Sequence, residues 1–171
     1  MRKGRCRMAI RPIAVERFSV ISSKPFDEVV QALDAAVGHP DMREFGKNVT
    51  EAKSWPEFEN VVQAALGPAG FMEFLRFNHG YMIAKDHGPT TPRILRLVVG
   101  NPLIMKRMAE HVPDAGSYAP VTILIDERND GVHISYDLMA SYLAPYGNLA
   151  ASQVARELDS KVEALLTAAA G

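Results

Sequence analysis

The chain has 171 residues, of which 47% are hydrophobic and 23% are charged, and its net charge at pH 7 is −1. This composition excludes a disordered or fibrous protein, and the length is that of one domain that can bury a core without disulfides or a structural metal. A binder of nucleic acid usually displays a basic face, which the balanced charge does not provide. No apolar stretch approaches the ~20 residues that a membrane-spanning helix requires, so no contact with a membrane is expected.

The N-terminal segment, residues 1–16, is predicted to be a flexible tail, and residues 17–171 to be a single α+β domain. Exposed termini fray easily, and the basic side chains of this one are Arg2, Lys3, Arg5, Arg7 and Arg11. The single cysteine, Cys6, lies in the same tail, so no internal disulfide can form. Because no continuous apolar leader follows the basic residues either, we expect a cytoplasmic protein.

A strand and a helix open the predicted domain. Apolar residues of Phe18–Ile21 stand among serines, which is typical of a strand. Pro25 suits the first turn of a helix, and apolar side chains recur at helical spacing as far as Val37. Gly38 and Pro40 then end the helix.

A second helical region follows. Asp41–Lys53 is polar and weakly patterned, which predicts a loop or a short helix. Ser54 and Glu57 form the pattern of a capping box and begin a helix that ends at Gly67 and Pro68.

Three strand-like runs come next, separated by glycine and proline. They are Phe71–Phe77, the weaker Tyr81–Ala84, and Ile94–Val99. Asn101 and Pro102 then have the residue types of a helix cap and first helical position.

The last third of the chain contains a hairpin and the longest helix. Val121–Ile125 and Val132–Tyr136 alternate apolar and polar residues around an Asn-Asp-Gly turn. Met139–Tyr146 is short and interrupted by proline, and Ala150–Ala169 has one apolar face. These elements predict an α+β fold, a two-layer α/β sandwich with a mixed, mainly antiparallel sheet packed against helices.

No motif of established chemistry is present. The sequence has no glycine-rich phosphate loop, no paired histidines at metal-binding helical spacing, no cysteine pair and no nucleophile elbow. The catalytic residues and the cofactor therefore stay unknown, and whether the protein is an enzyme is left open.

The densest polar cluster occupies residues 78–88. If its flanking strands pair, His79 and His87 lie on neighbouring segments and complete a metal site with Asp86 or Glu73. Alternatively, one histidine acts as a general base oriented by Asp86, or as an axial ligand of haem. The simplest interpretation makes both of them loop residues, with His79 hydrogen-bonded to the backbone at the end of a strand.

A small ligand pocket is the preferred hypothesis for this region. The polar residues that would line it are His79, Tyr81, Asn101 and Tyr118. They converge if Ile94–Val99 pairs beside Phe71–Phe77, and tyrosines beside a sheet can line a pocket with ring and hydroxyl together. The ordinary alternative is that Asn101 caps a helix and Tyr118 packs in the core.

Several short motifs also occur in a recognisable order. They are Phe-Asn-His-Gly at 77–80, Gly-Asn-Pro at 100–102, Tyr-Ala-Pro at 118–120 and Tyr-Asp at 136–137. In this order, and with an opening strand and helix over 18–37, the chain resembles the bacterial and archaeal family labelled domain of unknown function 302. The resemblance implies a compact α/β sandwich, commonly a homodimer, and no established reaction.

Three functions follow as hypotheses. The first is a small-molecule-binding or regulatory homodimer. The second is a metal- or haem-dependent protein or enzyme that uses His79 or His87. The third is a purely structural interaction domain that assembles through the apolar helix Ala150–Ala169.

Overall fold

One five-stranded sheet forms the centre of the structure, a computed structural model that describes residues 8–171. The strands lie in the order β1-β5-β4-β3-β2, and every neighbouring pair is antiparallel. Within residues 8–171 the only parallel pairing is an isolated bridge between Gly38 and Met72. The strands are β1 (Arg17–Ser22), β2 (Met72–Asn78), β3 (Ile94–Gly100), β4 (Val121–Arg128) and β5 (Gly131–Asp137).

Seven α-helices and two short 3₁₀ turns accompany the sheet in this part of the chain. They are α1 (Phe26–Ala36), α2 (Met42–Glu51), α3 (Trp55–Ala65), α4 (His79–His87), α5 (Pro102–Ala109), η1 (Pro113–Ser117), α6 (Met139–Leu143), η2 (Ala144–Tyr146) and α7 (Leu149–Ala170). No helix among residues 8–171 is long and apolar enough to cross a membrane.

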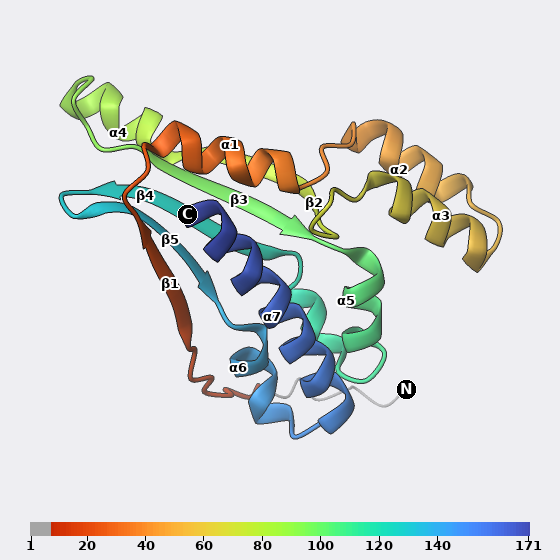
Figure 1. Ribbon diagram of the computed structural model, residues 1–171. Helices are drawn as coiled ribbons and strands as arrows, with labels where there is room; N and C mark the ends of the chain where they lie inside the picture. Colours follow the sequence, from red (N-terminus) through yellow and green to blue (C-terminus); the bar gives the residue numbers. More distant parts are fainter. Residues whose placement is uncertain (1–7) are drawn as a thin grey trace.

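Helices cover one face of the sheet, with α1 and α7 lying along it (Figure 1). Alternate side chains of a strand point to opposite faces. Those that join the helices in the core from β3, β4 and β5 are Leu95, Leu97, Val99, Val121, Ile123, Ile125, Val132, Ile134 and Tyr136. This arrangement confirms the predicted two-layer α+β sandwich.

The long helix α7 supplies much of the core. Its buried apolar side chains are Val154, Leu158, Val162, Leu165 and Leu166. The apolar face that suggested assembly through Ala150–Ala169 therefore packs against the sheet of its own chain. This face is therefore not free for assembly, and the hypothesis of a purely structural domain that associates through this helix loses its support.

A buried carboxylate fixes α7 to the end of β5. Asp159 is 5% exposed, and its Oδ1 accepts hydrogen bonds from the Tyr136 hydroxyl at 2.6 Å and the Met139 amide at 2.7 Å. Its Oδ2 accepts from the Ala140 amide at 2.9 Å. These amides belong to the first turn of α6, where a negative charge is favourable. Burial and the neighbouring carboxylate raise the pKa of Tyr136, so its hydroxyl keeps the proton that it donates.

The first strand begins at Arg17, where the sequence predicts the domain to begin. Residues 8–16 form no helix or strand, although the Glu16 carbonyl accepts a hydrogen bond from the Leu138 amide at 2.8 Å. Cys6 and the basic residues as far as Arg7 lie outside the described residues, so the flexible tail stays a prediction.

The predicted strand Tyr81–Ala84 is wrong, because these residues lie in helix α4. The Asn78 side chain accepts a hydrogen bond from the Tyr81 amide at 2.9 Å and so caps the helix. The helix starts against β3, where a Cβ atom on Gly80 would lie 2.8 Å from the Ile94 amide nitrogen. An apolar run of four residues is compatible with either structure, and here the cap and the close approach at glycine decide for the helix.

The region Asp41–Lys53, predicted as a loop or short helix, contains α2. Asp41 caps it by accepting hydrogen bonds from two amides. The predicted start of α3 is confirmed, since the Ser54 hydroxyl accepts from the Glu57 amide at 3.4 Å. The Glu57 carboxylate in turn accepts from the Lys53 amide at 2.8 Å. The cap at Ser54 is local, which is why the sequence predicts it.

We expect Asp159→Asn to lower the free energy of unfolding by about 1–3 kcal/mol. The variant replaces one acceptor oxygen with an NH₂ group, so a buried N–H or O–H donor loses its acceptor. Tyr136→Phe removes one donor and should cost about 1 kcal/mol. Chemical denaturation measures both. Asp86→Asn, at a side chain that is 85% exposed, is the matched control and should change little. Equal stability of Asp159→Asn and the control would contradict the role given to the carboxylate.

Candidate functional site

The sheet face opposite α1 and α7 carries polar side chains from several strands. The strand register aligns Arg96, Leu124 and Ser135 in one row across β3, β4 and β5. Arg17 of β1 and Asp137 of β5 are paired in an adjacent row. Residues far apart in the sequence thus meet on one surface.

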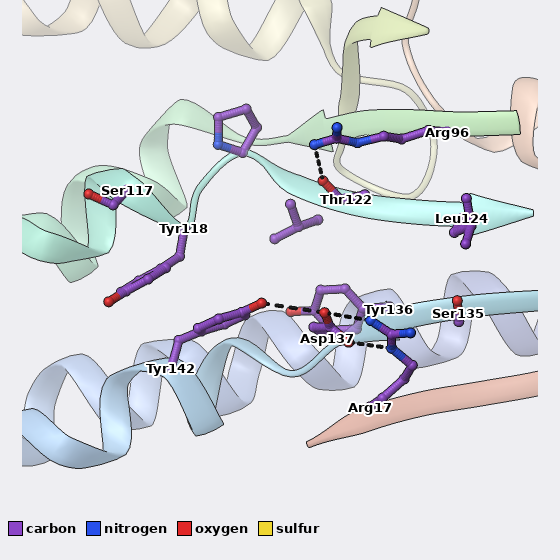
Figure 2. A pocket seen from close by; sticks show the side chains of 12 residues that line it. Arg17, Arg96, Ser117, Tyr118, Thr122, Leu124, Ser135, Tyr136, Asp137 and Tyr142 are labelled. Atoms are coloured by element: carbon purple, nitrogen blue, oxygen red, sulfur yellow. Dashed lines mark hydrogen bonds and ion pairs between the residues drawn. The ribbon is translucent and has the colours of Figure 1, made fainter. Parts of the chain in front are cut away.

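A pocket of about 400 Å³ lies on this face, where β4 begins and β5 ends (Figure 2). Two segments beyond the strands complete it: Tyr118 precedes β4, and Tyr142 lies in α6. The two rings stack, with centroids 4.7 Å apart and planes at 15°. The hydroxyl of Tyr118 also shares a hydrogen bond of 3.0 Å with that of Tyr146. One wall of the pocket is therefore aromatic and held in place.

One side of the pocket carries a compensated pair of charges. Arg17 donates from Nε and Nη2 to the two carboxylate oxygens of Asp137, at 2.6 and 3.0 Å. This guanidinium lowers the pKa of Asp137 below its usual range, so the carboxylate stays ionised at neutral pH. The Tyr142 hydroxyl donates to the same carboxylate at 3.4 Å. Burial and the nearby carboxylate raise the pKa of Tyr142, which therefore stays protonated.

The other side of the pocket carries a second guanidinium, that of Arg96, which has no carboxylate partner among residues 8–171. Arg96 donates from Nη2 to the Thr122 hydroxyl at 3.2 Å, and its guanidinium carbon lies 5.7 Å from the centre of the Phe77 ring. The pocket can therefore offer a charged donor group to a ligand.

Asn101 and Tyr118, two of the residues predicted to line a pocket, lie near each other in the fold. A Cβ atom on Gly100 would approach that of Pro120 to 3.0 Å, so the Gly-Asn-Pro and Tyr-Ala-Pro motifs pack together. Tyr118 lines the pocket of Figure 2, whereas Asn101 lines a smaller apolar pocket of about 140 Å³ beside α5.

The Asn101 side chain has a structural role. Its Oδ1 accepts a hydrogen bond from the Leu103 amide at 2.9 Å, which caps α5. Its Nδ2 donates to the Gly70 carbonyl at 3.0 Å. Both ends of the amide are occupied, which agrees with helix capping, the ordinary alternative that the sequence offers.

His79 and Tyr81, the other two predicted pocket residues, lie at the opposite end of β3. The β2–β3 register pairs Asn78, which precedes His79, with Leu95, whereas Asn101 follows the other end of that strand. Leu95 and Asn101 are six residues apart along the strand, which corresponds to about 20 Å. Figure 1 accordingly shows α4 and α5 at opposite ends of β3. The antiparallel pairing therefore keeps the four residues from sharing one small pocket.

The alternative metal site at His79, His87 and Asp86 is not assembled either. The two histidines begin and end α4, and eight residues of helix separate them by about 12 Å. The His79 ring stacks on Phe77 with centroids 6.1 Å apart, and the His87 side chain is 70% exposed. Residues 8–171 contain no group of three or more His, Cys, Asp or Glu side chains that could hold a metal ion. Neither histidine lines the two pockets above.

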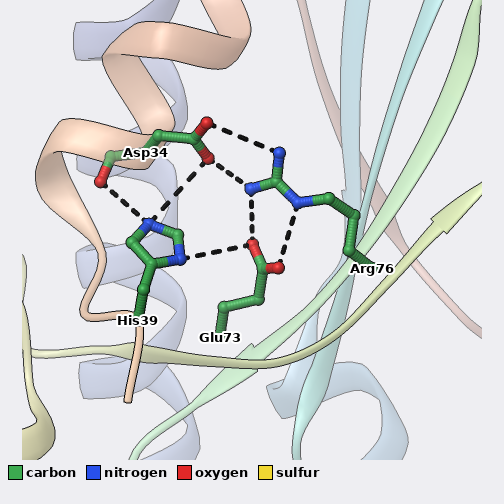
Figure 3. A network of polar contacts seen from close by, with 4 residues as sticks. All are labelled: Asp34, His39, Glu73 and Arg76. Atoms are coloured by element: carbon green, nitrogen blue, oxygen red, sulfur yellow. Dashed lines mark hydrogen bonds and ion pairs between the residues drawn. The ribbon is translucent and has the colours of Figure 1, made fainter. Parts of the chain in front are cut away.

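A separate polar cluster joins α1 to β2 (Figure 3). Arg76 donates to the carboxylates of Asp34 and Glu73, and these bonds raise the pKa of the guanidinium. The His39 Nε2 lies 3.0 Å from the Asp34 carbonyl oxygen, and its Nδ1 lies 3.9 Å from Glu73. Because the arginine already binds both carboxylates, this cluster fastens the helix to the sheet.

Four polar residues of the pocket were not expected from the sequence, namely Arg17, Arg96, Ser135 and Asp137. The available signal was alternation, because polar residues at every second position of a strand lie on one face. Alternation shows that such residues share a face, but it does not show which strands are neighbours.

Comparisons with known proteins agree on the fold. The family model described as domain of unknown function DUF302 matches residues 45–169. A crystal structure of an uncharacterized conserved DUF302 protein from Bacillus stearothermophilus is similar, with a TM-score of 0.62 and 14% sequence identity. The similarity covers 90% of this chain and 97% of that one. No curated protein matches the sequence.

We expect Asn101→Ala to lower the free energy of unfolding by about 1 kcal/mol, because it removes the cap of α5 and the bond to Gly70. Asn60→Ala, at an exposed position of α3, is the control and should leave stability unchanged or slightly higher. Thermal denaturation compares the two variants. A melting temperature of Asn101→Ala equal to that of the wild type would argue against the structural role.

Proposed function

The chain belongs to the DUF302 family, and we propose that it is a small-molecule-binding homodimer whose ligand occupies the pocket between Arg96, Tyr118 and Tyr142. The observation that carries the proposal is the pocket itself. Its volume of about 400 Å³ falls within the range of ligand sites, roughly 300–1,000 Å³. An aromatic wall with a few polar groups is also the usual lining of such sites.

Binding is favoured over catalysis by the polar contacts in the pocket. A nucleophilic mechanism requires a hydroxyl or thiol within hydrogen-bond reach of a base. In the pocket, the Tyr142 hydroxyl donates to Asp137. Arg17 already binds this carboxylate and lowers the pKa of Asp137. A carboxylate stabilised in its ionised form is a weak base.

Association of two copies is proposed through the sheet face that carries the pocket. Leu75 and Phe77 of β2 are 55% and 41% exposed on this face, and Ile21 of β1 is 52% exposed. Leu75 and Phe77 lie together on the β2 edge of the sheet, whereas Ile21 lies on the opposite edge, and adjacent exposed apolar side chains are typical of an interaction surface. Because α7 is already buried, this face is the better candidate, and a second copy on it would restrict access to the pocket.

We expect Leu75→Glu to shift the protein from dimer to monomer, because a carboxylate would be buried without a partner in the interface. Met82→Glu, on the exposed surface of α4, is the control and should remain dimeric. Size-exclusion chromatography with light scattering, at tens of micromolar protein, measures the mass. A wild-type protein that is monomeric under these conditions would refute the homodimer.

The pocket is tested with a thermal-shift screen of small metabolites. A ligand that binds the folded state raises its melting temperature. We expect compounds that stabilise the wild type to lose their effect on Leu124→Arg, which places a long side chain in the pocket, and to retain it on the control Ile83→Arg in α4. Compounds that stabilise all three proteins equally would place binding elsewhere.

A further inference from the structure

The arginines of the sheet differ in one respect that bears on the ligand. Arg17, Arg76 and Arg128 lie on strands and each forms an ion pair with a carboxylate of this chain. Arg96 is the fourth arginine on a strand, and within residues 8–171 it has no carboxylate partner. The arginine on a strand that has no carboxylate partner among these residues, Arg96, thus lines the pocket.

The net charge of the pocket is consequently positive. Two guanidinium groups, of Arg17 and Arg96, face one carboxylate, that of Asp137. Both oxygens of this carboxylate bind Arg17, and one also accepts from Tyr142, so its charge is compensated within the protein. The charge of Arg96 is left for a ligand.

Hydroxyl groups supplement the guanidinium. Thr122 accepts a hydrogen bond from Arg96, which leaves the hydroxyl proton of Thr122 free to be donated. Ser135 lies on the same row of the sheet as Arg96 and is 7% exposed, and its hydroxyl lines the pocket (Figure 2). Within residues 8–171 the Ser135 hydroxyl has no hydrogen-bond partner. No buried side-chain nitrogen or oxygen of these residues lacks a partner, so the Ser135 oxygen is accessible from the pocket, where a ligand or water can bind it.

From these contacts we infer that the ligand is a small organic anion, with a carboxylate or phosphate group bound by Arg96, Thr122 and Ser135. The inference rests on the proposed function, because it specifies the ligand of the same pocket. A guanidinium matches the two oxygens of these groups in a bidentate arrangement. The stacked rings of Tyr118 and Tyr142 supply an apolar surface for the body of the ligand.

The size of the pocket restricts the ligand further. Its volume is near the lower end of the range for small-molecule sites, roughly 300–1,000 Å³. A compact ligand with one acidic group and a flat or apolar body fits these dimensions, whereas a polymer such as a nucleic acid does not.

The test uses phenyl phosphate, benzoate, inorganic phosphate and neutral benzamide as probes, with binding measured by titration calorimetry on the full chain. We expect phenyl phosphate or benzoate to bind the wild type more tightly than benzamide or inorganic phosphate. Arg96→Gln should weaken the organic anion about tenfold or more, since charged hydrogen bonds are the strong ones. Arg96→Lys should fall between, because it keeps the charge and loses the bidentate geometry.

Arg43→Gln is the control for net charge, because Arg43 is exposed on α2, outside the pocket, and it should bind as the wild type does. Thermal melts without probe establish that each variant is folded. Should Arg96→Gln fail to fold, Ser135→Ala takes its place and should weaken the organic anion measurably.

Three results would overturn the inference. Benzamide binding as tightly as benzoate, with no effect of Arg96→Gln, would show a neutral ligand class while leaving the small-molecule pocket intact. Inorganic phosphate binding as tightly as phenyl phosphate would remove the organic body. Failure of every anion to bind the wild type would reject the anion class, whereas the broader metabolite screen judges the pocket separately.

Discussion

The buried carboxylate of Asp159 is the contact on which the arrangement of α7, α6 and the end of β5 depends. It comes from the middle of the longest helix and accepts hydrogen bonds from the Tyr136 hydroxyl and from the amides of Met139 and Ala140. A charge in the core is tolerated only when donors surround it, and these three do so. Because the donors lie on either side of the chain reversal after β5, one interaction fixes the strand end, the next helix and α7 together.

This contact also determines where the pocket lies. Because side chains alternate along β5, Asp137 points to the face of the sheet opposite to that of Tyr136, and the short α6 that follows carries Tyr142. The hydrogen bond between Tyr142 and Asp137 joins these two parts above the sheet. The face that α7 covers and the face that carries the pocket are thus coupled through two successive residues of β5, the buried Tyr136 and the partly exposed Asp137.

An antiparallel sheet with helices on one face leaves its second face for other uses. Here that face combines exposed apolar side chains at Leu75 and Phe77 with a cation at Arg96 that no carboxylate of residues 8–171 neutralises. Neither feature contributes to the stability of the isolated chain in the way that the core does. The apolar side chains support the proposed association of two copies, and the cation supports the proposed binding of a ligand. Light scattering tests the first proposal, and thermal-shift and titration experiments test the second.

By itself, the sequence determined the features that depend on neighbours a few residues away. The cap at Ser54, the turn before β5 and the apolar face of α7 are local, because capping hydrogen bonds and side-chain periodicity operate within a few residues. The helix over residues 79–87 depends on the local cap at Asn78 and also on the close approach of Gly80 to β3, which only the tertiary structure provides. Only the tertiary structure decided that His79 lies far from Asn101. The pocket likewise depends on strand register, which joins segments many residues apart, and alternation along one strand cannot reveal its neighbours.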